Sequence, residues 1–277
     1  MLRPVSVLFL AALGLLSSCA VGLLEPVTPP QFAAGGTALP VLGMTPLVPG
    51  QRISFGEFQL GKVQRGWTST RYYPAGVAGP GATGSEVLDV LTFPAAEVFR
   101  NSSSKLQFSL QAGPRRADVY CVDRVTSREL SSITPLLGGP LRITRDWKNT
   151  FSGFIIGPEV DAVKVWNVLL ASSDMPDYRT DPSPVVGVVG RGDSVLLQVR
   201  AVVRHTIRHP KTNQEVALPV PMPIGYEIVL EQQPIGFVDF QMPQPRIWLR
   251  NNLPAEVRFL TANTAATVML WGRTSRM

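Results

Sequence analysis

The chain has 277 residues, of which 45% are apolar and 17% are charged. This composition excludes the disordered class of proteins, which combines low hydrophobicity with a high net charge. The formal net charge is +6, from 26 basic and 20 acidic residues, and the basic residues never form a run of five or more. The sequence therefore lacks the basic arm typical of nucleic-acid-binding proteins, and we expect no nucleic-acid partner.

The first twenty residues combine Arg3, an apolar run over Val5–Leu16 and the sequence Leu16-Ser17-Ser18-Cys19. A basic start, an apolar core of about 7–15 residues and a small-residue exit mark a secretory signal. The run is shorter than the roughly 20 residues that cross a bilayer as a helix, which disfavours the alternative of an uncleaved anchor. The segment resembles the type II signal peptide of bacterial lipoproteins, whose lipobox ends in a cysteine.

This resemblance implies that residues 1–18 are removed and that Cys19 becomes the lipidated N-terminus. The family carries a diacylglycerol on the cysteine sulfur and usually a further acyl chain such as palmitate on its nitrogen. In the family an Asp after the cysteine often marks retention at the inner membrane, so Ala20 implies the outer membrane. We therefore expect a lipid-anchored envelope protein, with envelope proteins or anionic lipid as further partners.

Residues 19–50 are rich in Pro, Gly, Ala and Thr and carry few charges. Such a composition predicts a flexible tether between the lipid and the folded body. Residues 51–277 are predicted to form a single domain. Because lipidation consumes Cys19, Cys121 has no partner for an intramolecular disulfide, and its strand-like surroundings favour a buried small hydrophobe.

Strand signals dominate the body of the chain. Short runs of β-formers alternate with turn residues every 8–15 positions, as in Leu106–Gln111 and Val119–Val125. The 25 prolines suit strand ends and edges and would be costly in many helices. The pattern predicts a mainly β fold, either an antiparallel sandwich or a closed barrel.

The last element differs from the others. Pro254 and Glu256 are typical of a helix start, and Val257–Trp271 carries no charge after Arg258. A helix without a polar face must be buried, so we predict a helix over residues 254–271 packed against or inside the sheet. The alternative is a hairpin that turns at Ala262-Asn263-Thr264.

A β-rich body that ends in a hydrophobic helix resembles the tubby and scramblase type of barrel, in which a closed sheet wraps such a helix. The residues that carry this resemblance are Gly236-Phe237-Val238-Asp239 and the run from Leu253 to Trp271. Some members of that superfamily bind phosphoinositides through basic residues. No such motif matches here, so no binding residue is carried over.

Three local patterns contain residue types that can bind a metal ion or a partner protein. His205 and His209 have the i,i+4 spacing of a zinc pair, but Thr206 replaces the required Glu, and a solvated basic hairpin explains them better. Asp174, Asp177 and Asp181 offer oxygen ligands for Ca²⁺ without the spacing of a calcium loop. Arg191-Gly192-Asp193 is the tripeptide that integrins recognise, and it also suits a plain hairpin turn.

No nucleophile elbow, phosphate-binding loop, paired CxxC or dinucleotide fingerprint occurs in the sequence. We therefore predict a non-enzymatic binding or structural module without a cofactor or metal. One alternative is a surface adhesin that uses Arg191, Gly192 and Asp193. The other is a hydrolase whose carboxylates come from separate strands, because such pairs leave no local motif.

Overall fold

The computed structural model describes residue 32 and residues 35–44, 52–74, 95–132, 142–157, 164–173, 184–192, 194–208, 215–240 and 245–274. These residues form strands and one long C-terminal helix, so the predicted mainly β class is confirmed. The strands are β1 (Gly36–Pro40), β2 (Ser54–Phe55), β3 (Phe58–Leu60), β4 (Gln64–Arg65), β5 (Ser69–Pro74), β6 (Ala95–Ala112), β7 (Arg115–Ser132), β8 (Arg142–Gly157), β9 (Lys164–Ser173), β10 (Val185–Arg191), β11 (Ser194–Arg208), β12 (Glu215–Leu230), β13 (Gln233–Asp239) and β14 (Arg246–Arg250).

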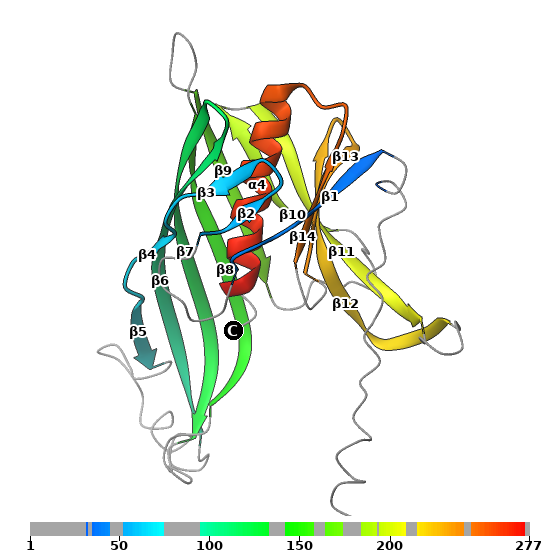
Figure 1. The fold of residues 1–277 in the computed structure, drawn as a ribbon. Helices are drawn as coiled ribbons and strands as arrows, with labels where there is room; N and C mark the ends of the chain where they lie inside the picture. The colour runs from blue at the N-terminus through cyan, green and yellow to red at the C-terminus, as the bar shows by residue number, and fades with distance from the viewer. Residues whose placement is uncertain are drawn as a thin grey trace, which may run out of the picture.

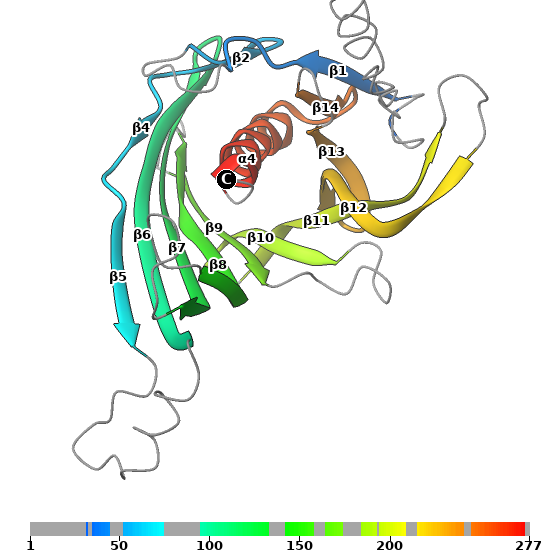
Figure 2. The same ribbon diagram turned by 90° about the horizontal axis from the view of Figure 1, so that it is seen from below.

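The sheet is antiparallel and curls until its two edges nearly meet (Figure 2). Its order is β1-β14-β13-β12-β11-β10-β9-β8-β7-β6-β3-β2, with β4 and β5 also paired to β6. Leu42, just after β1, and Ser54 of β2 exchange two backbone hydrogen bonds of 2.8 and 3.1 Å, which join the edges. Of the two predicted architectures, the structure has the barrel.

The helix α4 (Ala255–Thr274) runs through the middle of this barrel (Figures 1 and 2). Every side chain from Phe259 to Trp271 is buried, and Ala262, Ala265 and Ala266 have no exposed surface. Small side chains at these positions let the helix lie close to the surrounding strands. The predicted buried helix is therefore confirmed, and the alternative hairpin is wrong.

The polar side chains of α4 find hydrogen-bond partners within the helix itself. Thr261, Thr264 and Thr267 each donate from their hydroxyl to the carbonyl four residues earlier, at 2.7–2.9 Å. Asn263 donates from its amide to the carbonyl of Phe259 at 2.9 Å. These bonds explain how a helix with four buried polar residues can lie in an apolar core, because buried donors without partners are costly.

The wall begins earlier in the chain than predicted. Gly36–Pro40 falls within the range 19–50 assigned to a tether, yet these residues form β1 and pair with β14. Phe32 is also fully buried, and its ring stacks on that of Phe237 in β13 with centroids 6.4 Å apart. Apolar residues of the supposed tether thus belong to the barrel, because burial of an aromatic ring outweighs the flexibility of the surrounding Gly and Pro.

We expect Ala266→Glu to destabilise the whole barrel. A carboxylate at this fully buried position would lose its hydration, and the cost should be about 4 kcal/mol of unfolding free energy in urea denaturation. The matched control is Ala255→Glu, at the exposed first turn of the same helix, which should change stability by less than about 0.5 kcal/mol.

The same constraint can be tested by removing the helix. A chain that ends at Asn252 should lose its cooperative thermal unfolding transition, because the inner face of the sheet would then face water. A truncated chain that retained native β-sheet circular dichroism and a cooperative transition would contradict this account.

Candidate functional site

Several residues singled out in the sequence lie outside the described residues. These are Cys19 with its signal peptide, Asp193, His209 and the loop Asp174-Asp177-Asp181. His205 lies in β11, where its backbone alone is described. Among the described residues no group of three or more His, Cys, Asp or Glu side chains could hold a metal ion.

Arg191 and Gly192 lie where the chain turns from β10 to β11. Arg191 pairs with Ser194, and Gly192 is exposed with φ at +58°, a backbone conformation that favours glycine. The predicted turn geometry is confirmed for the two described residues of the tripeptide. Gly190, the residue before this turn, pairs with Asn167 of β9, which places the turn beside the β9 wall.

Cys121 lies on the inner face of β7 and is buried and unpaired with another cysteine. Burial raises the pKa of its thiol to about 12, so the thiolate is scarce at neutral pH. The interpretation of Cys121 as a buried small hydrophobe is confirmed.

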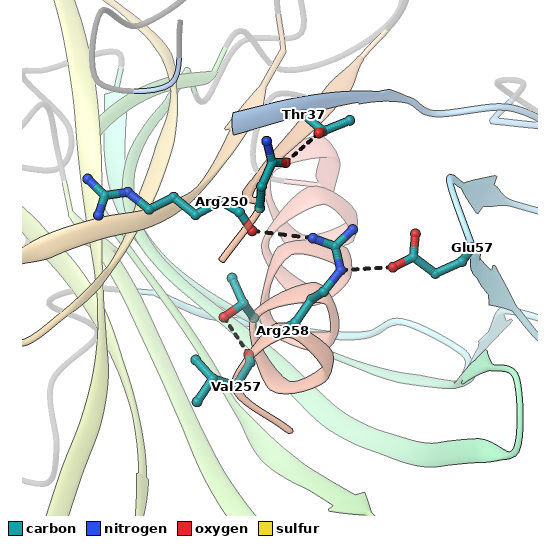
Figure 3. Close-up of polar contacts among 7 residues, drawn as sticks. Thr37, Glu57, Arg250, Val257 and Arg258 are labelled. Atoms are coloured by element: carbon teal, nitrogen blue, oxygen red, sulfur yellow. Dashed lines mark hydrogen bonds and ion pairs between the residues drawn. The ribbon is translucent and has the colours of Figure 1, made fainter. Parts of the chain in front are cut away.

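The N-terminal end of α4 is held to the wall by Arg258 (Figure 3). Its Nε donates to Oε1 of Glu57 at 2.9 Å, and its NH1 donates to the carbonyl of Arg250 at 3.3 Å. The guanidinium also lies 5.8 Å from the ring centroid of Phe58. Glu57 follows Gly56, whose φ of +55° turns the chain between β2 and β3.

A second ion pair holds the opposite side of the same helix end, where Lys164 of β9 donates to Glu256 at 2.8 Å. Partial burial alone would raise the pKa of Glu57, but the hydrogen bond from Arg258, a backbone hydrogen bond within Glu57 and the Arg258 charge together lower it. The two pairs come from different parts of the wall. They therefore fix the position of α4 in the barrel rather than form a site for a ligand.

Polar side chains replace apolar ones on the inner face of the wall farther along β6–β8. Asp123 is 8% exposed and Asn149 is 1% exposed. The Asp123 pKa is raised by burial, while the Asn149 amide and the Arg65 charge oppose this effect. The Asn149 amide lies near enough to Asp123 to lower the pKa of its carboxyl group. Oδ1 of Asp123 and both polar atoms of the Asn149 side chain nevertheless have no hydrogen-bond partner among the described residues.

Two oppositely charged side chains, those of Arg100 and Glu129, also lie on this inner face. Glu129 of β7 is 4% exposed. It accepts a hydrogen bond from the Ser127 hydroxyl at 2.9 Å and lies 3.7 Å from NH1 of Arg100. Asp123 and Glu129, the two buried carboxylates of this region, both come from one strand.

The outer face of the wall carries a shallow groove across β6–β9. Its volume is about 390 Å³, and its floor includes Cys121 and Gly153, which belong to the inner face. A Cβ atom at Gly153 would lie 2.2 Å from the carbonyl oxygen of Tyr120. Only glycine therefore allows β7 and β8 to approach so closely at this point.

Four groove side chains form one row across the strands. Gln107 pairs with Tyr120, Tyr120 with Phe154, and Phe154 with Asn167. Directly paired residues project from the same face of a sheet. The Tyr120 and Phe154 rings are 41% and 51% exposed. An amide thus lies at each end of the row and two aromatic rings lie between them.

Three cations lie on one side of this row, and the register places Lys105, Arg124 and Lys148 progressively farther from it, at two, four and six residues along their strands. Lys105, Arg124 and Lys148 are exposed, and none forms an ion pair with a described residue. Asp118 and Asp146, which share this outer face, are paired with Arg116 and Arg128.

Sequence reasoning missed this groove because its row unites residues from four strands. The available signal was the apolar character of Tyr120, Phe154 and Leu169, which alternate with buried inner residues. Strands that are apolar on both faces are typical of a sheet covered on both sides.

Comparisons with protein families, curated proteins and solved structures find nothing that this chain matches. Within the described part of the chain, no helix is long and apolar enough to span a membrane.

We expect Glu57→Gln to weaken the attachment of α4 at pH 7. The cost should be about 0.5 kcal/mol of unfolding free energy, because the carboxylate is half exposed and water screens the pair. A lowered folded-state pKa means that this stabilisation is present above the unfolded pKa of about 4.5 and is lost as the pH falls.

Urea denaturation of both proteins at pH 7 and pH 3 measures this difference, which should vanish at pH 3. Glu231→Gln is the matched control, since Glu231 is exposed and forms no ion pair with a described residue. A Glu57→Gln deficit that persisted at pH 3 would show that the charge of Glu57 is not its cause.

Proposed function

We propose that the protein is a lipid-anchored, non-enzymatic binding module of the bacterial cell envelope. The anchor is the diacylglycerol on Cys19, and the outer membrane is its location. The lipobox-like sequence Leu16-Ser17-Ser18-Cys19 supports the anchor.

The observation that carries the binding role is the outer groove over β6–β9. Helix α4 packs against a cluster of buried apolar side chains on the inner face of the wall. The outer wall offers two half-exposed rings, two amides and one lysine, Lys105, at this groove. Exposed aromatic groups gathered with polar ones are typical of an interaction site.

A second candidate function is adhesion through the hairpin turn at Arg191 and Gly192. The exposure of both residues at the tip of β10–β11 favours it. Protease treatment of intact cells separates the two functions, because an adhesin must be cleaved at the cell surface whereas a module that faces the periplasm is protected.

Replacement of Cys19 by Ser should release the protein from the membrane. The thioether to diacylglycerol requires the cysteine sulfur, so the variant should take up no labelled palmitate and should move to the aqueous phase in detergent partition. The matched control is Cys121→Ser, which should keep its label because Cys121 is buried in the barrel. A wild-type chain that takes up no palmitate would refute the anchor.

The binding role predicts that the barrel adheres to envelope material without its lipid. The full chain with Cys19→Ser should sediment with a delipidated envelope fraction. Adding Tyr120→Ala and Phe154→Ala should lower the bound amount at least about fivefold. Leu196→Ala is the matched control, since Leu196 is an exposed apolar residue outside the groove lining. Equal sedimentation of all three proteins would refute the groove as the binding surface.

A further inference from the structure

We propose that the sheet edge formed by β4 and β5 binds an extended acidic segment of a partner protein, which adds to the sheet as a further strand. This surface differs from the groove over β6–β9, because no residue of β4 or β5 lines that groove. The inference follows from three features of the edge: its pairing on one side, the exposure of Trp67 and the charge of residues 58–74.

The edge pairs on one side only. β4 and β5 both pair with β6, in a register that runs from Gln64 opposite Gln107 to Pro74 opposite Val98. No other described strand pairs with either of them, and they lie on the side of β6 that faces away from β7 (Figures 1 and 2). An edge strand presents backbone N–H and C=O groups with which an added strand can pair.

This edge is also open to solvent. Every residue from Gln64 to Tyr72 is exposed apart from Thr70, which is partly buried and donates from its hydroxyl to that of Ser102 at 3.2 Å. The six residues of β5 span about 20 Å, the length of an ordinary strand. A partner segment of similar length therefore has both access to the edge and room to pair with it.

Trp67 distinguishes this edge from one that only faces water. It lies between β4 and β5 and is 99% exposed. Tyr72 of β5 and Phe99 of β6 are also exposed large side chains. Tryptophan and tyrosine are enriched among the residues that dominate binding energy, because burial of their rings removes much apolar surface from water. The aromatic side chains thus supply the contacts that a bare strand edge lacks.

The charge of the edge selects the partner. Residues 58–74 contain Lys62, Arg65 and Arg71 and neither Asp nor Glu. Basic residues protect an edge strand from pairing with a second copy of itself, because like charges would then lie opposite each other. The same cations attract an acidic segment and suppress the wrong partners. Charge complementarity therefore favours an acidic strand over a second copy of this chain.

A membrane surface is the main competitor, because tryptophan and tyrosine also gather at lipid interfaces. A strand edge suits a bilayer poorly, since its backbone groups would lose water without gaining hydrogen-bond partners. Anionic vesicles are therefore one arm of the experiment.

The test uses the full chain with Cys19→Ser and a fluorescent ten-residue peptide of alternating glutamate and valine. In fluorescence anisotropy, Trp67→Ala should weaken binding of this peptide at least about fivefold, and Arg71→Gln should weaken it about threefold. Leu196→Ala and Arg115→Gln are the matched controls. Leu196 is an exposed apolar residue of β11, and Arg115 is an exposed cation at the end of the β6–β7 hairpin remote from β5.

Two further peptides test the charge and the backbone pairing. A peptide with lysine in place of glutamate should bind at least about tenfold more weakly, and equal binding would refute an acidic partner. A peptide methylated on every backbone nitrogen keeps its side chains but cannot donate hydrogen bonds, so it should also bind at least about tenfold more weakly. Equal binding of the methylated peptide would refute strand addition.

Hydrogen exchange gives an independent measurement of the added strand. Binding of the unmodified peptide should slow amide exchange in β5, which a contact through side chains alone would not cause. Phosphatidylglycerol vesicles that bind in a Trp67-dependent way, without binding of the peptide, would overturn the proposal in favour of a membrane contact. A chain that binds neither probe would refute the edge as an interaction surface.

Discussion

Burial of an uncharged helix is the constraint on which the rest of the structure depends. From Phe259 to Trp271 every side chain of the helix is buried and uncharged, and its Thr and Asn residues donate hydrogen bonds to its own backbone. Only a wall on every side can cover such a surface, and a curled antiparallel sheet provides it. The dependence is mutual, because the inner face of the sheet is buried only when this last segment of the chain is in place. Arg258 and Glu256 then fix the helix at one end through partners on separate parts of the wall.

The sequence predicted this core well because its signals are local. The absence of charge after Arg258 and the start at Pro254 are contained in one short run, and the structure has the helix there. The boundaries of the wall were harder to predict. Phe32 and β1 lie among Gly, Ala and Pro residues that favour a tether, and only contact with distant β13 and β14 makes them structural. The turn at Gly56-Glu57 positions the carboxylate that binds Arg258, and nothing local indicates a partner that lies 201 residues later in the chain.

The outer groove could not be predicted because it depends on register. Tyr120 and Phe154 meet only if β7 and β8 pair as they do, and a shift of one residue would move either ring to the inner face. The same holds for the inner polar region. Asp123 and Asn149 belong to strand-like runs, and nothing local distinguishes their burial from exposure. Register thus turns ordinary strand residues into two chemically distinct faces of one wall, an inner face that holds α4 and an outer face with rings and cations.

The attachment of Phe32 also bears on how the proposed anchor would orient the barrel. Between Cys19 and Phe32 the chain advances 13 positions (32 minus 19), which span at most about 45 Å when fully extended. The lipid would therefore keep Phe32 and its contact on β13 within that distance of the membrane. In Figure 2 the strands β6–β8 lie across the barrel from β13 and β14, with α4 between them. Because the groove faces outward from β6–β9, it lies on the part of the wall opposite the point where the tether would attach, so attachment at Phe32 does not cover it.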